Sequence, residues 1–131
     1  MINVDHNPIE TEEGVWAPPY KGVEFLLAHV SCMAFQKKLA RLQQPYAKKI
    51  EKGTLSPEIQ KEVLCRAMAG TIVRNWRGPG MVNNNKESVA YSDDMAYRVL
   101  MQHIDVREYV TEFSQNLDNY REEEAEELGN T

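Results

Sequence analysis

The chain has 131 residues, of which 42% are hydrophobic and 27% are charged, and its net charge is −5. This length is enough for one domain with a core but not for two, and the composition is that of an ordinary globular protein. No apolar run reaches the ~20 residues that span a bilayer, and the first residues lack a signal-peptide pattern. We therefore expect a cytoplasmic protein with no membrane partner.

The charge is unevenly distributed along the chain. Residues 1–13 carry −4 and residues 121–131 carry another −4, which leaves +3 for residues 14–120. The basic surplus lies on Lys37, Lys38, Arg41, Lys48, Lys49 and Lys52. Acidic ends around a mildly basic body do not suit nucleic acid as the main partner. The simplest interpretation of the basic set is a solvated helix surface.

The prolines and the acidic runs divide the chain into three parts. Residues 1–21 contain Pro8, Pro18 and Pro19 among scattered acids, so we predict an irregular N-terminal arm there. Residues 22–120 form the folded domain in this interpretation, and residues 121–131 form an acidic C-terminal tail. The partial alternation of apolar residues over 23–27 predicts a short strand at the start of the domain.

The first helix is predicted to begin after Ser31, which can cap it. Its apolar row has helical spacing and consists of Phe35, Leu39, Leu42, Tyr46 and Ile50. Pro45 should interrupt this helix because proline lacks a backbone N–H. Gly53 suits the left-handed residue that ends a helix.

The second helix is predicted to begin at Ser56-Pro57-Glu58, which supplies a cap, a first-turn proline and a favourable acid. Its apolar row consists of Ile59, Val63, Ala67 and Gly70. The helix is predicted to continue to Trp76, whose large side chain is expected to fill space in the core. The long loop 77–91 follows, in which residues 81–82 and 88–91 are expected to pair as a small hairpin.

Ser92 is expected to cap the third helix, with Asp93 and Asp94 in its first turn. Asp105 and Glu108 resemble a capping box at the start of the last helix. That helix shows the clearest amphipathic pattern, with Val106, Val110, Phe113, Leu117 and Tyr120 on one face. The predicted fold is therefore mainly α, a small domain of about four helices with a short N-terminal strand and a β-hairpin-like loop.

The sequence does not favour an enzyme. His6, His29 and His103 are scattered, and no nucleophile, base and orienting acid are grouped in sequence. Cys32 and Cys65 are too few for a disulfide framework and are expected to be packed thiols. The spacing His29-x-x-Cys32 has no matching second pair, so we predict no metal and no cofactor.

Two segments, together with the acidic end, carry a resemblance to a known family. Trp76-Arg77-Gly78 closes a predicted helix, and Tyr91-Ser92-Asp93-Asp94 begins the next one. In this order the chain, over roughly residues 23 to 128, resembles the tail assembly chaperones of tailed bacteriophages. The N-terminal segment Trp16–Tyr20 has no counterpart in that family pattern.

The resemblance implies a protein that binds the tape measure protein and keeps its aggregation-prone helices soluble while the tail forms. It also implies recruitment of tail tube protein, residence in the host cytoplasm and absence from the finished virion. Candidate partner-binding residues are exposed apolar side chains near the loop and on the last helix, namely Met81, Val82, Tyr91, Phe113, Leu117 and Tyr120. The amphipathic helices also allow a homo-oligomer.

Many such chaperones are made in a second, longer form through a −1 ribosomal frameshift. Leu128-Gly129-Asn130 permits the corresponding slippery codons, so we predict a frameshift there. Three alternatives stay open: a minor structural tail or connector protein retained in the virion, a helical adaptor from a prophage region, and an enzyme. A helix-turn-helix DNA-binding protein is rejected because the segment between the second and third helices exceeds the usual ~3–4 residue turn.

Overall fold

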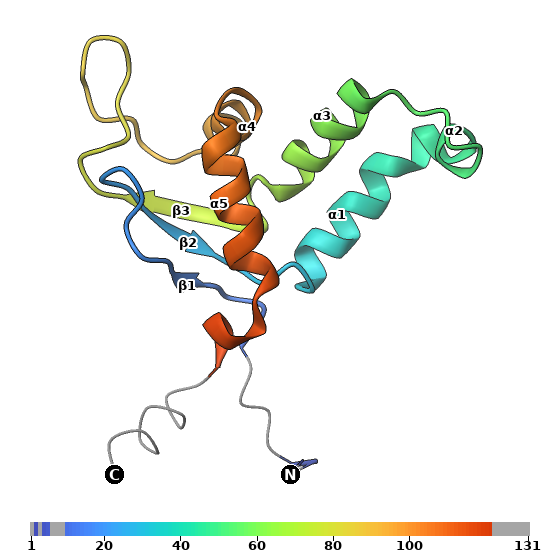
Figure 1. Cartoon of the computed structure of the whole chain (residues 1–131), viewed down its shortest axis with the longest axis horizontal. Helices are drawn as coiled ribbons and strands as arrows, with labels where there is room; N and C mark the ends of the chain where they lie inside the picture. The colour runs from blue at the N-terminus through green and yellow to red at the C-terminus, as the bar shows by residue number, and fades with distance from the viewer. Residues whose placement is uncertain (1, 3, 6–9, 122–131) are drawn as a thin grey trace.

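The computed structural model describes residues 2, 4–5 and 10–121 of the chain (Figure 1). The strands are β1 (Val15–Trp16), β2 (Glu24–Leu27) and β3 (Val73–Arg77). The α-helices are α1 (Met33–Gln43), α2 (Ala47–Glu51), α3 (Pro57–Met68), α4 (Asp93–Gln102) and α5 (Ile104–Gln115), and the short 3-10 helices are η1 (Gln44–Tyr46) and η2 (Leu117–Tyr120).

The three strands form one antiparallel sheet in the order β1-β2-β3. Phe25 on β2 lies opposite Trp76 on β3, and Leu27 lies opposite Val15 on β1. Phe25 and Leu27 are buried while their neighbours on β2 are partly exposed, so β2 alternates as the sequence predicted. Helix α5 contacts β2, and the main core gathers between the helices and the sheet.

The structure corrects the prediction of a mainly α fold, because the domain is mixed α/β. The second helix was expected to reach Trp76, but α3 ends at Met68 and residues 73–77 form the strand β3. The chain leaves the helical conformation at Ala69, which is extended, and Gly70 follows at φ +81°, a left-handed conformation that a helix cannot contain. Thr71, Ile72 and Val73 then form a β-branched run that suits a strand better than a helix.

Several predicted element boundaries are confirmed. Pro45 lies in η1, which separates α1 from α2, and Gly53 has φ +68° just after α2. The Ser56 hydroxyl accepts the backbone N–H of Ile59 at the start of α3. The Ser92 hydroxyl likewise accepts the N–H of Met95 at the start of α4. Each of these signals is local, so the sequence displays it directly.

Two predicted caps are wrong. Ser31 does not cap α1; its hydroxyl lies 2.7 Å from His29 Nδ1, and the Glu12 carboxylate accepts the N–H of Met33 instead. Asp105 and Glu108 form no capping box on α5, whose N-cap is His103 without a side-chain bond. Asp105 instead accepts hydrogen bonds from the side chains of Tyr20 and Lys21. In both cases the observed hydrogen bond joins residues that are distant in sequence, Glu12 to Met33 and residues 20–21 to Asp105.

The last helix is shorter than predicted, because α5 ends at Gln115 and residues 117–120 form η2. The expected loop hairpin is present only as a single bridge between Val82 and Ser88, outside any named strand. Of the N-terminal arm, β1 joins the sheet and Ala17 is buried. The acidic tail lies outside the described residues except for Arg121, and the predicted frameshift position at 128–130 lies outside them entirely.

Cys32 and Cys65 are buried free thiols, as predicted. Burial raises the pKa of the Cys65 thiol, which keeps it protonated. In the part of the chain that the structure describes, no helix combines the length and the apolar character that a membrane crossing requires.

Candidate binding surface

The helices α1, α2 and α3 form a helical hairpin that extends away from the sheet, with α2 at its far end (Figure 1). Phe35 at one root of the hairpin, and Cys65 and Met68 at the other, are buried in the main core. Between residues 36 and 64, all of which the structure describes, Leu55 is the single buried residue. The far half of the hairpin therefore has almost no core of its own.

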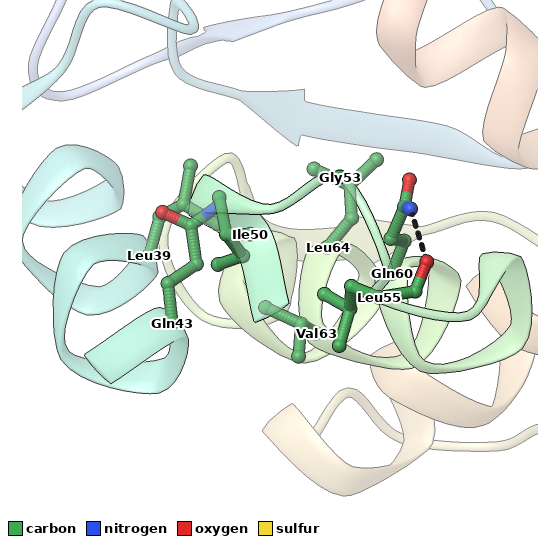
Figure 2. A pocket seen from close by; sticks show the side chains of 8 residues that line it. All are labelled: Leu39, Gln43, Ile50, Gly53, Leu55, Gln60, Val63 and Leu64. Carbon is green, nitrogen blue, oxygen red and sulfur yellow. Dashed lines mark hydrogen bonds between the residues drawn. The ribbon is translucent and has the colours of Figure 1, made fainter. Parts of the chain in front are cut away.

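An apolar groove lies between the helices in this far half (Figure 2). It has a volume of about 350 Å³ and is lined by Leu39, Gln43, Ile50, Gly53, Leu55, Gln60, Val63 and Leu64. Ile50 and Leu64, which both line the groove, are 41% and 39% exposed, so two large aliphatic side chains are open to solvent there. The Gln60 amide donates to the Leu55 carbonyl oxygen at 2.8 Å, which fixes the loop that closes one end of the groove.

The hairpin is positively charged. Residues 33–64 contain seven Lys or Arg and three Glu, a net charge of +4, so the rest of the chain carries −9. Five of these cations form no ion pair within the described ranges of the chain. They are Lys37, Arg41, Lys48, Lys49 and Lys52. Arg41 also lines a shallow depression beside the groove, together with Gln43, Ile50 and Glu51.

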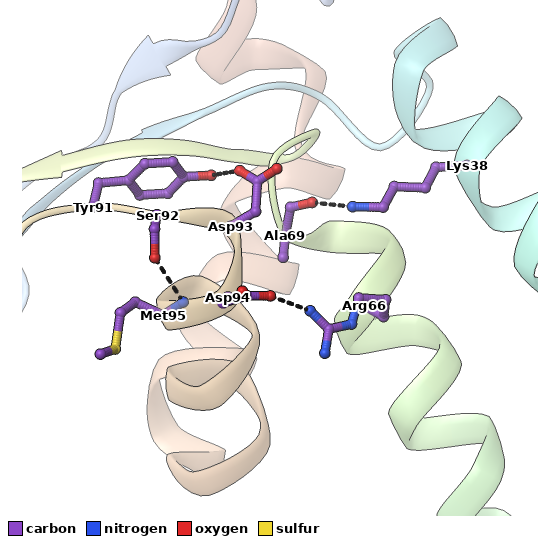
Figure 3. A network of polar contacts seen from close by, with 8 residues as sticks. All are labelled: Lys38, Arg66, Ala69, Tyr91, Ser92, Asp93, Asp94 and Met95. Carbon is purple, nitrogen blue, oxygen red and sulfur yellow. Dashed lines mark hydrogen bonds and ion pairs between the residues drawn. The ribbon is translucent and has the colours of Figure 1, made fainter.

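Polar contacts hold the hairpin against the body of the domain (Figure 3). The Lys38 ammonium donates to the Ala69 carbonyl oxygen at 2.6 Å, and burial lowers the pKa of Lys38. On α3, the Arg66 guanidinium pairs with the Asp94 carboxylate at 3.0 Å and lies 3.7 Å from the centre of the Tyr97 ring. The first contact joins α1 to the C-terminal end of α3, and the Arg66 contacts join α3 to α4, so the hairpin is fixed against the body of the domain.

A second apolar cavity, of about 310 Å³, lies where the loop after β3 returns past α4 and α5. Its lining residues are Tyr20, Lys21, Val23, Phe25, Gly80, Met81, Val82, Val99, His103, Asp105 and Val106. Unlike the groove, this cavity has a paired charge at its rim, because the Lys21 ammonium lies 2.7 Å from Asp105. The hydrogen bonds from Lys21, and then from Tyr20, lower the pKa of Asp105 to about 2.

The structure separates the six predicted partner-binding residues into three places. Met81 and Val82 line the second cavity, and Val82 is 46% exposed. Tyr91 packs edge-on against Trp76, with its ring centre 5.0 Å away, and its hydroxyl donates to the Val73 carbonyl oxygen.

The other three lie at the opposite end of the domain. Phe113 and Tyr120 contact each other with ring centres 5.8 Å apart, and Tyr120 is buried against His29. Leu117, by contrast, is 43% exposed. Since Tyr120 is buried, a partner contacts its ring only if η2 moves.

The sequence prediction missed the groove, although the residues that line it were noticed. Leu39 and Ile50 were assigned to one apolar row on the first helix, and Val63 to another on the second. Helical spacing shows that residues share a face, but it does not show whether another element covers that face. The available signal was that Leu55 is the single large apolar side chain in residues 52–56 that could fill the space between the two helices.

The acids that could suggest catalysis make structural contacts. Asp93 accepts a hydrogen bond from the Tyr91 hydroxyl at 3.0 Å, and Asp94 pairs with Arg66 (Figure 3). Among the residues that the structure describes, no group of three or more His, Cys, Asp or Glu could hold a metal ion.

The fold and these surfaces define a small mixed α/β domain with open apolar grooves. A family model described as "YdaY prophage protein" matches residues 30–130. The chain belongs to this family and is therefore phage-derived. Searches among curated proteins and among solved structures each found no match. The family assignment supports the phage origin implied by the sequence, and it leaves the specific role to be argued from the surfaces.

Proposed function

We propose that this prophage protein is a tail assembly chaperone that binds the tape measure protein and keeps it soluble while the tail forms. The function is one of binding without catalysis, exercised in the host cytoplasm. In this proposal the protein leaves before the virion is complete and also brings in tail tube protein. A longer form made by frameshifting at residues 128–130 would share the same domain.

The observation that carries the proposal is the apolar groove of the helical hairpin. A tape measure protein is long and helical, and its apolar faces need temporary cover before the tail closes around it. Large exposed apolar patches on a small protein mark interaction sites, and the hairpin has open aliphatic side chains at Ile50 and Leu64. The phage origin of the family supplies the setting.

The charge distribution supports the same role. The chain carries a net charge of −5, and its acidic residues concentrate at the two ends. A net charge well away from zero keeps a protein and its complexes soluble. A chaperone that covers an aggregation-prone client benefits directly from this property.

The direct test is co-expression of the chain with the tape measure protein of the same prophage. We expect the tape measure protein to move from the insoluble to the soluble fraction and to co-purify with the tagged chain. Mass spectrometry of purified virions, where the prophage can be induced, should not detect the chain.

Two outcomes would contradict the proposal. If the tape measure protein stays insoluble and unbound when both forms of the chain are supplied, the chaperone role fails. If the chain is found in virions at a fixed copy number, it is instead a minor structural tail or connector protein.

A further inference from the structure

We infer that the groove between α1, α2 and α3 binds one amphipathic α-helix of a partner protein, whose apolar stripe is flanked by acidic residues. The inference rests on the proposed function for the identity of that partner, the tape measure protein. It adds which surface is used, which conformation the bound segment takes and which charge it carries.

The first argument is that no further long helix packs against α1 and α3 in the far half of the hairpin. Two antiparallel helices bury apolar residues only along their shared seam, and a bundle needs another helix to cover the remaining face. Here the residues from 36 to 64 bury Leu55 alone. Leu39 and Val63 line the groove, with Ile50 and Leu64 more exposed at its opening (Figure 2). The position of a third helix is therefore open.

The second argument concerns the backbone of the occupant. The walls of the groove are helices, whose backbone groups are already hydrogen-bonded within each helix. An extended peptide would find no strand edge there to pair with, and its own backbone groups would be left without partners in an apolar groove. A helix satisfies its backbone internally and presents only side chains. Helix-in-groove binding is thus the mode that fits these walls.

The third argument concerns charge. The hairpin carries +4, and the five cations without an ion pair in the described ranges include Arg41 on α1, Lys48 and Lys49 on α2, and Lys52 just after α2. Acidic residues beside the apolar stripe of a bound helix would meet these side chains. A second copy docked hairpin to hairpin would instead bring two surfaces of the same charge together. The charge therefore favours an acidic partner helix over self-association through the hairpins.

The test uses two synthetic helical peptides with the same leucine stripe, one flanked by Glu and the other by Lys. Fluorescence anisotropy should give at least about tenfold tighter binding of the Glu peptide at low salt, with the difference shrinking as salt screens the charges. Amide NMR shifts of the wild-type chain should change mainly within residues 39–64. The double variant Ile50→Ser/Leu64→Ser should lose about tenfold or more in affinity for the Glu peptide.

The matched control is Ile104→Ser, which also removes an exposed aliphatic side chain but lies on α5. It should bind the Glu peptide as the wild type does, and circular dichroism should show that all variants fold. Equal binding of the two peptides, or shift changes confined to residues 81–91, would overturn the inference. So would a dimer of the wild type that the double variant abolishes, because the groove would then hold a second copy.

The inference and the proposed function can fail separately. If the tape measure protein co-purifies equally well with the wild type and with the double variant, the chaperone role stands and the groove assignment is wrong. If the Glu peptide binds in the groove but the tape measure protein is never bound, the groove assignment stands and the chaperone role is wrong.

Discussion

The Glu12 carboxylate caps α1 from outside the helix, with its two oxygens 2.9 and 3.1 Å from the backbone nitrogen of Met33. The same N-terminal segment is fixed at two further points. The N–H of Glu10 donates to the Tyr120 carbonyl oxygen, and the Thr11 carbonyl oxygen accepts the N–H of His29. The segment before β1 therefore connects the start of the hairpin to the end of the chain's described part.

Replacing Glu12 by alanine should destabilise the domain by about 1 kcal/mol, the usual cost of losing a helix N-cap. The first-turn N–H loses its acceptor, and the positive end of the helix dipole loses a neighbouring carboxylate. Urea denaturation followed by circular dichroism measures the change in the free energy of unfolding. Glu13→Ala, which removes an exposed carboxylate next in sequence, is the control and should change stability by less than about 0.5 kcal/mol. Equal effects of the two substitutions would show that the cap contributes nothing specific.

Trp76 connects β3 to the loop that follows it. Its indole N–H donates to the Val89 carbonyl oxygen at 2.9 Å, and its ring contacts Tyr91. Trp76→Phe should cost about 1–3 kcal/mol, because it removes this hydrogen bond and leaves space in the core. Hydrogen exchange should show faster exchange of the Val89 amide, whose N–H donates to the Met81 carbonyl oxygen.

The control for Trp76→Phe is the same substitution at the other tryptophan, Trp16→Phe. The Trp16 ring is half-buried, with the Arg77 guanidinium 3.9 Å from its centre. Because phenylalanine keeps a smaller aromatic ring, this contact is weakened, which should cost less than about 1 kcal/mol and leave exchange in the loop unchanged. If both tryptophan substitutions accelerate exchange in the loop to the same degree, the Trp76 hydrogen bond is not what holds it.

The elements that the sequence predicted correctly are those whose signals are local. Ser56-Pro57 and Ser92-Asp93 mark helix starts through side chains that bond within one turn, and Pro45 breaks a helix at its own position. The strand β3 was missed because its stability comes from pairing with β2, where Phe25 lies opposite Trp76. That pairing joins residues about fifty positions apart, and no periodicity within 70–77 reports it.

The same distinction explains the candidate site. Met81 and Val82 were predicted to be exposed because they lie in a polar loop, and the prediction is confirmed for Val82, which is 46% exposed. Helical spacing could not predict the groove, since its openness depends on what does not pack against Leu39 and Val63. Tyr120 was placed on the helix face by spacing, but α5 ends at Gln115 and η2 turns the Tyr120 ring into the interior against His29.

Tyr91, which is partly buried, and Tyr120, which is buried, should respond differently to loss of the hydroxyl. The Tyr91 hydroxyl donates to the Val73 carbonyl oxygen at 2.7 Å and lies 3.0 Å from Asp93, and burial, followed by the bond to Asp93, raises the pKa of Tyr91. Tyr91→Phe should therefore cost about 1 kcal/mol.

The Tyr120 hydroxyl is buried without a hydrogen-bond partner among the described residues, and burial raises the pKa of Tyr120. Tyr120→Phe keeps the ring contacts with His29 and Phe113, so the free energy of unfolding should stay the same or increase. Thermal and urea denaturation of the two variants side by side give the comparison. A larger loss for Tyr120→Phe than for Tyr91→Phe would mean that the Tyr120 hydroxyl has a partner in solution.

The cluster at Asp105 predicts a pH dependence of stability with a definite sign. Hydrogen bonds from Lys21 and Tyr20 lower the pKa of the Asp105 carboxyl from 3.8 to about 2 in the folded state. The stabilisation is therefore fully present above about pH 4 and is lost as the pH falls towards 2. Between these pH values the melting temperature of the wild type should fall more steeply than that of Asp105→Asn, whose side chain does not titrate.

Carboxyl NMR titration tests the cause directly. Lys21→Met should raise the pKa of Asp105 most, because the Lys21 ammonium makes the strongest contribution, and Tyr20→Phe should raise it by less. Glu108→Gln on the same helix is the control, since it removes a nearby carboxylate without touching either hydrogen bond to Asp105. If Lys21→Met leaves the Asp105 titration unchanged, the ion pair between Lys21 and Asp105 does not form in solution, and the rim of the second cavity is open there.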